Sequence, residues 1–214
     1  FQRRFDRNFI ELKNTLSKIG NPRIIKTSSR DNPEPSLEYL KISGNIFHDM
    51  LIHDFDMMLF LLGLKIPKSI YAMGHSYNPA IAEFDDFDTV MVTLHYEDGL
   101  MVMIDTSRIA AYGYDQRVEV FAKDGMAIAE NQRDHSVQLH NIHGMNVAPI
   151  NYSFPQRYVE AYGLEIEAFA KAIENKQNFT ITYEECLLAH LIADAAHESA
   201  VSGKVIDFKT NYWK

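Results

Sequence analysis

The chain has 214 residues and a formal net charge of -8, with 46% hydrophobic and 12% aromatic residues. This composition supports a packed core and excludes an intrinsically disordered chain, and the acidic balance argues against nucleic acid as a partner. No apolar run approaches the ~20 residues of a membrane span, so no membrane partner is expected. The single cysteine, Cys186, excludes an intrachain disulfide and suits a reducing compartment, so a cytoplasmic location is expected. Its apolar neighbours favour a buried side chain over a reactive thiol.

The first segment of the chain predicts a helix, a strand and a turn-rich stretch. Asp6 and Gly20 stand where the cap and the end of a helix belong, and apolar residues between them fall on one face. Residues 23–29 predict a strand. Two prolines break regular structure in residues 30–45.

A second helix is predicted over Ile46–Leu62, with Asn45 as its cap and Gly63 at its end. Its apolar residues surround nearly the whole helix, so we expect it to be mostly buried. It nevertheless carries the stretch "FHDMLIHDFDMM", which places two histidines and three aspartates inside an apolar segment.

The middle of the chain changes to strand-like runs, at residues 69–77, 88–109, 116–131 and 136–142. The tripeptides "EDG" and "KDG" predict hairpin turns, which join neighbouring strands into an antiparallel sheet. The last third predicts two helices and a short closing strand, at residues 155–176, 183–203 and 204–208. This order predicts an α+β fold, a large and mostly antiparallel sheet with helices packed on one face. The second face of such a sheet is free, and self-association would cover it.

The acidic and histidine side chains of the second helix are the strongest candidates for a site. Asp49 and His53 are four residues apart and share a helix face with Asp56. A carboxylate beside an imidazole can accept a hydroxyl proton at neutral pH and return it. Two alternatives stay open, a satisfied buried Asp–His pair and a metal site formed by the three residues. The His–His spacing of zinc proteases is absent, since His48 and His53 are five residues apart.

Weaker candidates lie outside this helix. The loop "AYGYDQR" places Tyr112 and Tyr114 between two strands, where they could bind a ligand or belong to a plain connector. The opening "FQRR" offers Arg3 and Arg4 as candidate site residues. Both could equally be ordinary arginines exposed on the surface. Asp31, in "RDN", could reach a polyol or simply form a turn.

Several of these segments together resemble the family that includes glucose–fructose oxidoreductase, inositol 2-dehydrogenase and MocA. They run in order over nearly the whole chain, as "FQRRFDRNF", "TSSRDNPEP", "SGNIFHDMLIHDFDMMLFLLG", "AYGYDQRVEVFAKDG", "FPQRYVEAYGLEIEAFAKAI" and "HESAVSGKVI". The D-x-x-x-H-D-x-D pattern of the helix is the most specific of them. The segments "FQRRFD" and "YGYDQR" make the resemblance closest to the inositol 2-dehydrogenases.

The resemblance implies a C-terminal substrate-binding and oligomerisation domain over residues 1–214, lacking the Rossmann domain that binds NAD or NADP. None of the ten glycines forms a G-x-G pair, which agrees with a missing nucleotide fingerprint. The implied parent enzyme is an NAD(P)-dependent polyol dehydrogenase, most closely an inositol 2-dehydrogenase, that oxidises a ring hydroxyl to a ketone. Without the nucleotide domain, we expect the chain neither to bind NAD measurably nor to turn over inositol.

The resemblance also implies the roles of individual residues. Asp49 and His53 match the catalytic pair, with His53 as the base and Asp49 as the group that orients it, and no metal takes part. Asp56 is expected to have a structural role. Other residues match positions that contact the substrate or the cofactor in this family. Substrate contacts are implied for Tyr114 or Tyr112, for Arg3 and for Asp31, and cofactor contacts for Arg3 and Asn45.

A function of another class stays open beside the enzyme. The chain could be a non-catalytic binding or oligomerisation module that forms a homodimer or homotetramer through its free sheet face. A sugar dehydrogenase of the same family is a further alternative. The polyol itself, and the choice between NAD and NADP, are not determined by these residues.

Overall fold

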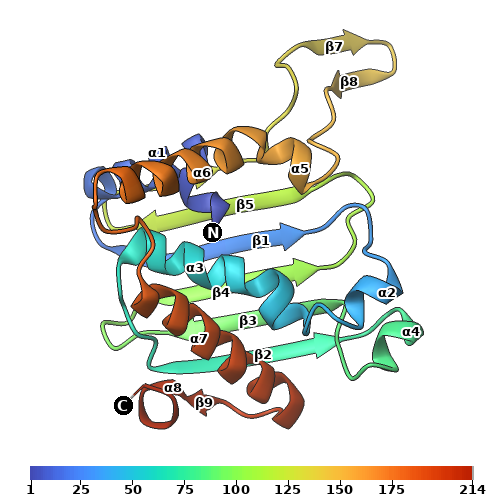
Figure 1. Ribbon diagram of the computed structural model, residues 1–214. Coiled ribbons are helices and arrows are strands. Elements are labelled where there is room, and N and C mark those ends of the chain that lie inside the picture. The colour runs from blue at the N-terminus through green and yellow to red at the C-terminus, as the bar shows by residue number, and fades with distance from the viewer. Residues whose placement is uncertain (214) are drawn as a thin grey trace.

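The computed structural model describes residues 1–213, and its centre is a seven-stranded sheet in the order β6-β5-β1-β4-β3-β2-β9 (Figure 1). Its strands, in chain order, are β1 (Pro22–Arg30), β2 (Ser69–His75), β3 (Thr89–His95), β4 (Met101–Ser107), β5 (Asp115–Ala122), β6 (Gly125–Ala129) and β9 (Ile206–Asp207). β1 pairs with β4 in parallel, and the other pairs of this sheet are antiparallel. The predicted turns join β3 to β4 and β5 to β6, and Gly99 supplies the positive φ of the first turn.

Helices cover one face of this sheet (Figure 1). In chain order they are η1 (Gln2–Phe5), α1 (Arg7–Ile19), α2 (Leu37–Leu40), η2 (Phe47–Leu51), α3 (Ile52–Leu62), α5 (Phe154–Arg157), α6 (Val159–Glu174) and α7 (Tyr183–Ser202). Two further short helices are α4 (Pro79–Ala82) and α8 (Phe208–Asn211). The arrangement confirms the predicted α+β fold with a mostly antiparallel sheet and helices on one side.

The core lies between the sheet and α3 and α7. Alternate strand residues such as Ile25, Val92 and Ile104 point inward and are completely buried against Phe55 and Ile192. α3 is buried over most of its surface, as predicted, because it packs over the sheet with α7 beside it in the same layer and η1 against it (Figure 1). The opposite sheet face has no helix over it in Figure 1, and its large apolar side chains are exposed.

The predicted helix over Ile46–Leu62 begins with a π-helical turn, η2, before it continues as α3. Asn45 precedes it as predicted, and its Oδ1 accepts hydrogen bonds from the backbone N–H groups of Phe47 and His48. Gly63 ends α3 with a positive φ of 74°. π-helical turns are rare and occur frequently at functional sites, so η2 indicates a functional site near this end of the helix.

A small hairpin of β7 (Gln138–Asn141) and β8 (Gly144–Val147) forms a separate two-stranded sheet that projects from the body (Figure 1). The sequence predicted β7 but not β8, because β8 is only four residues long and its brief alternation of Met145 and Val147 is too short to predict a strand. The prediction that Cys186 is buried is wrong: its side chain is exposed on α7. The residues that directly follow it, Leu187, Leu188 and Ala189, are apolar, so the local sequence does not reveal that Cys186 faces water. Across residues 1–213, no helix is both long enough and apolar enough to cross a membrane.

Candidate functional site

A cavity of about 510 Å³ opens where the loop after β1 and the short helix α2 approach η2 and α3. It brings together five of the residues singled out from the sequence, namely Arg3, Asp31, Asp49, His53 and Tyr114. Glu34, Ser36 and Tyr39, from the loop after β1 and from α2, add polar groups to the same wall. The cavity therefore combines the titratable pair of the second helix with hydrogen-bonding groups suited to a polar ligand.

Asp49 is held in this cavity by two partners that come from other elements. Nη1 of Arg108 donates to Asp49 Oδ2 at 2.8 Å, and the Tyr39 hydroxyl donates to Asp49 Oδ1 at 2.6 Å. The Arg108 side chain is 0% exposed, so its charge lies against that of Asp49 without water between them. The hydrogen bond to Asp49 raises the pKa of Tyr39 to about 12, which keeps the phenol a donor.

Arg108 extends this support to the start of the helix. Its Nη2 donates to Asp86 Oδ2 at 2.9 Å, and Asp86 Oδ1 accepts from the backbone N–H of Ile46 at 2.9 Å. The guanidinium thus fixes both the carboxylate in the cavity and the first residue of the turn that carries it. Such charge-assisted contacts are stronger than neutral hydrogen bonds, so they restrict where Asp49 can move.

His53 lines the same cavity in a different electrostatic state. Burial, together with the positive charge of Arg3, lowers the pKa of His53 to about 3. Its Nδ1 is buried and has no hydrogen-bond partner within residues 1–213. At neutral pH the ring is therefore neutral, with a lone pair free on one ring nitrogen, and the lowered pKa makes it a weaker base than an ordinary imidazole.

Asp49 and His53 share the cavity, but the direct hydrogen bond that their spacing predicts is not among those of the described residues. Both oxygens of Asp49 are instead occupied by Tyr39 and Arg108. The guanidinium offers Asp49 a charged, fully buried partner, whereas the neutral ring of His53 does not. The pair is thus arranged as two separate groups on one wall.

The remaining acidic residues of the helix point away from the cavity into η1. Nη1 of Arg3 donates to Asp54 Oδ1 at 2.9 Å, and Arg4 makes a bidentate contact with Asp56 at 2.7–3.0 Å. Both arginines are buried, so surface exposure does not explain them. Burial would lower the pKa of Arg3, but the Asp54 carboxylate raises it above its ordinary value. Asp56 lies with Arg4, so Asp49, His53 and Asp56 do not converge on a metal site.

The two loop tyrosines are separated by the structure. Tyr114 is 5% exposed and lines the cavity, whereas Tyr112 is 55% exposed and is not among the lining residues. The Tyr112 hydroxyl donates to Asp115 Oδ2 at 2.5 Å and accepts from Arg30 Nη1 at 2.9 Å. Tyr112 thus belongs to a polar cluster at the edge of the sheet.

Asp31 and Asn45 occupy different positions relative to the cavity. Asp31 lines it, and burial raises the pKa of its carboxyl to about 7, even though Arg3 acts in the opposite direction. Asn45 is not a lining residue, and its Oδ1 is occupied by the cap of η2 and by the His48 ring. Asp31 can therefore meet a ligand directly, whereas Asn45 acts on the helix that carries Asp49.

Comparison with known proteins places this geometry in a family. The model of the GFO/IDH/MocA C-terminal domain matches residues 13–128, which is more than half of the chain. The chain belongs to the GFO/IDH/MocA family.

Relatives within the family include an inositol 2-dehydrogenase of Rhizobium meliloti, 40% identical over 96% of this chain and 63% of its own length. A myo-inositol 2-dehydrogenase of Thermotoga maritima is 38% identical over 93% of this chain and 60% of its own length. A crystal structure of scyllo-inositol dehydrogenase from Lactobacillus casei, with bound NAD(H) and scyllo-inositol, superposes with a TM-score of 0.87. It is 27% identical and is matched over 97% of this chain and 63% of that one. The chain thus spans about three fifths of the length of the curated relatives named here.

Sequence reasoning missed Arg108 and Tyr39, which hold Asp49. Arg108 directly follows β4, and a charged residue at the end of an alternating strand is a weak sign of a role beyond the sheet. Tyr39 lies in the first turn of α2, a helix of four residues inside a segment that reads as irregular. Their partner Asp49 lies 59 and 10 residues away, respectively, so local patterns do not connect them.

Proposed function

We propose that this chain is the catalytic and substrate-binding part of an NAD-dependent polyol dehydrogenase, with an inositol as substrate. The observation that carries the proposal is the shared cavity of a neutral His53 and an arginine-bound Asp49. The names of the relatives from R. meliloti and T. maritima, and the ligands named for the L. casei structure, support the inositol and the NAD.

In this proposal His53 is the base and Asp49 is a fixed acceptor for the substrate. The neutral ring of His53 takes the proton of the reacting hydroxyl, at a contribution of typically ~10²–10⁴ in rate. Asp49 accepts a hydrogen bond from a hydroxyl of the substrate. Arg108 and Tyr39 hold the Asp49 carboxylate in position for that hydrogen bond. Asp31 and Tyr114 line the same cavity and contact the other hydroxyls.

The cavity suits a nicotinamide-dependent oxidation. The buried Nδ1 of His53, without a partner within residues 1–213, belongs to a base kept free of competing contacts. A bound nicotinamide would supply the acceptor for the hydride that leaves the carbon bearing the hydroxyl. Arg3 lines the cavity and offers a contact to the cofactor, and Asn45 contributes by fixing η2.

We further propose that residues 1–214 form a substrate-binding and oligomerisation domain and that a separate domain holds most of the nucleotide. The sheet contains a single parallel pair, β1 with β4, and no G-x-G pair occurs in the sequence. On this view the 214-residue chain alone neither binds NAD measurably nor turns over inositol. Such an enzyme acts in the cytoplasm.

Turnover of myo-inositol by the full enzyme that contains this chain tests the catalytic assignment. His53→Ala should lower kcat by roughly 10²–10⁴ with the fold intact, and Asp49→Asn should lower kcat/KM. His143→Ala, an exposed histidine in the β7–β8 turn, is the matched control and should leave both constants unchanged. Unchanged rates in His53→Ala would remove the assignment. A panel of myo-inositol, scyllo-inositol and glucose separates an inositol dehydrogenase from a sugar dehydrogenase.

The free face of the sheet supports self-association as part of the same proposal. It presents a band of exposed apolar side chains from neighbouring strands, formed by Met73, Met91, Met101, Met103, Phe121, Met126 and Ile128. An apolar patch of this kind on a sheet is typical of a protein interface. We propose that two copies pack their sheets together there, as a homodimer or within a homotetramer.

Sedimentation at micromolar concentration tests the sheet interface. Met91→Glu combined with Met103→Glu places charges in the centre of the band and should yield monomers. Val201→Glu, an exposed position at the end of α7, is the control and should leave the assembly unchanged. A wild-type chain that sediments only as a monomer would contradict the interface.

A further inference from the structure

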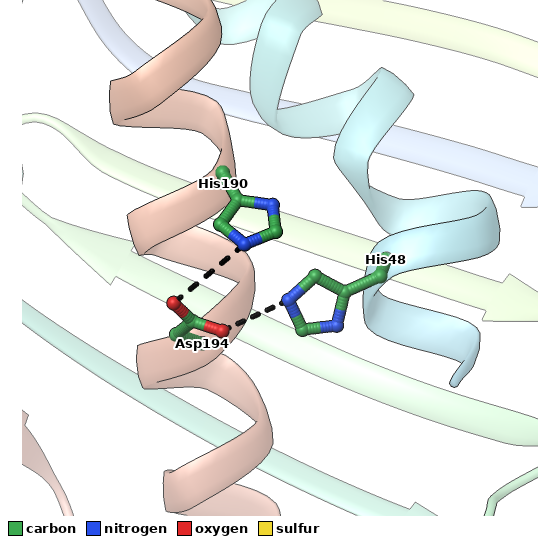
Figure 2. Close-up of side chains that lie close together, drawn as sticks. All are labelled: His48, His190 and Asp194. Carbon is green, nitrogen blue, oxygen red and sulfur yellow. Dashed lines mark hydrogen bonds and ion pairs between the residues drawn. The ribbon is translucent and has the colours of Figure 1, made fainter. Parts of the chain in front are cut away.

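Three side chains that the proposed reaction does not use converge beside the helix that carries Asp49. His48 comes from η2, and His190 and Asp194 come from one face of α7, four residues apart (Figure 2). Nε2 of His48 lies 2.9 Å from Asp194 Oδ1, and Nε2 of His190 lies 4.0 Å from Asp194 Oδ2. One ligand atom of each residue lies within 4.8 Å of the others, so the group can surround a single ion.

The hydrogen bonds around His48 fix which ring nitrogen carries a proton. Asn45 Oδ1 accepts from the backbone N–H groups of Phe47 and His48, which identifies that atom as the oxygen of the amide. The same oxygen lies 2.9 Å from His48 Nδ1, so Nδ1 must be the donor. In the neutral ring Nε2 then carries no proton, and its lone pair points at the Asp194 carboxylate.

A lone pair facing a carboxylate is unfavourable unless a positive charge lies between them. A second proton on the His48 ring would supply that charge, and so would a metal ion without requiring the proton. A metal-ligating histidine typically donates its other ring N–H to an oxygen of the protein, which orients the ring. Asn45 gives His48 this contact before any ion is bound.

The donor set and the mobility of the side chains agree with a metal. Two imidazole nitrogens and one carboxylate oxygen suit borderline divalent cations such as Zn²⁺, with water as the fourth ligand. Ligands at zinc distances lie about 3.3 Å apart in a tetrahedron, so the most widely separated atoms, up to 4.8 Å apart, must close in by up to about 1.5 Å. The side chains of His190 and Asp194 are 56% and 40% exposed and can turn, whereas His48 is held.

We propose that His48, His190 and Asp194 bind one borderline divalent cation, of which Zn²⁺ is the test case, and that the ion ties η2 to α7. Its role is structural. It anchors the π-helical turn next to Asp49, and the proposal does not depend on what the cavity binds or converts.

Zinc titration of the purified protein, made without a histidine tag and stripped with chelator, tests the site. Calorimetry should give one ion per chain, and saturation at 100 times Kd should raise Tm by roughly 5–11 °C. Co²⁺ should give the visible absorption of a tetrahedral site. His190→Ala and Asp194→Asn should each weaken binding by about tenfold or more, since even outer-shell changes cost 10–100-fold.

Two controls keep the test decisive. His143→Ala removes an exposed histidine elsewhere and should bind zinc as the wild type does. His190 and Asp194 lie on the exposed side of α7, so their variants should fold with an unchanged Tm in the absence of metal. Absence of stoichiometric zinc binding, or binding that His190→Ala and Asp194→Asn leave unchanged, would overturn the proposal.

Discussion

The neutral state of His53 has a consequence for stability that needs no substrate or cofactor. In the unfolded chain this side chain takes up a proton as the pH falls through about 6.5. In the folded protein, burial and the charge of Arg3 lower its pKa to about 3, so it stays neutral. The extra proton favours the unfolded state. The stability is therefore fully present above about pH 6.5 and is lost as the pH falls toward about 3.

The size of the effect follows from the two pKa values. Each pH unit between them changes the free energy of unfolding by about 1.4 kcal/mol once the unfolded histidine is protonated. Between about pH 7 and about pH 5, integration gives a loss of about 2 kcal/mol from His53 alone. The folded protein binds almost no proton at this site over that range, so the loss does not depend on whether the folded pKa is 3 or 4.

Urea unfolding of the wild type and of His53→Gln at both pH values isolates this contribution. Far-UV circular dichroism follows the helices, and the fluorescence of Trp213, which packs against the core, follows the closing segment. The wild type should lose about 2 kcal/mol more than the variant, because all other titrating groups are common to both.

His143→Gln should behave as the wild type does, because that histidine is exposed. If the wild type and His53→Gln lose equal stability between the two pH values, His53 is not buried in its neutral form. The buried, neutral ring on which the assignment of His53 rests would then be refuted.

Three further changes test other contacts. Burial raises the pKa of Asp31 to about 7, so its contribution to stability is lost as the pH rises through that value. Between about pH 5 and pH 8, urea unfolding should show that the wild type loses roughly 2–3 kcal/mol more than Asp31→Asn. Asp56→Ala leaves Arg4 buried with only Glu185 and should destabilise by about 3 kcal/mol, whereas Arg4→Met with Asp56→Leu should recover most of that loss; equal losses would refute the role of the pair. Thr182→Ala removes the capping box of α7 and should lower stability by about 1 kcal/mol, with Thr180→Ala as the neutral comparison.

The sequence predicted those features that depend on neighbouring residues. Asp6, Gly20 and Gly63 mark the ends of helices because side-chain caps and glycines with positive φ act within a few residues. The hairpin turns at Gly99 and Gly125 follow the same logic. The family pattern added Asp49 and His53, and the structure places both in one cavity.

Other features depend on contacts across the chain and have no local signal. β1 pairs in parallel with β4, although helices and two strands separate them in sequence. Arg108 reaches Asp49 from the end of a strand, and neither residue's neighbours reveal the other. The apolar periodicity of residues 46–62 predicts a helix there but does not distinguish the π-helical turn η2 from an α-helical one.

The projecting hairpin of β7 and β8 is a ribbon that should accept inserted residues with little loss of folding stability. All of its strand residues are exposed, and it forms a sheet separate from the main one. An epitope or a fluorophore attachment sequence inserted at Ile142–His143 would lengthen the ribbon without moving a core side chain. The same property makes this ribbon the natural handle for immobilising or labelling the protein while the cavity stays free.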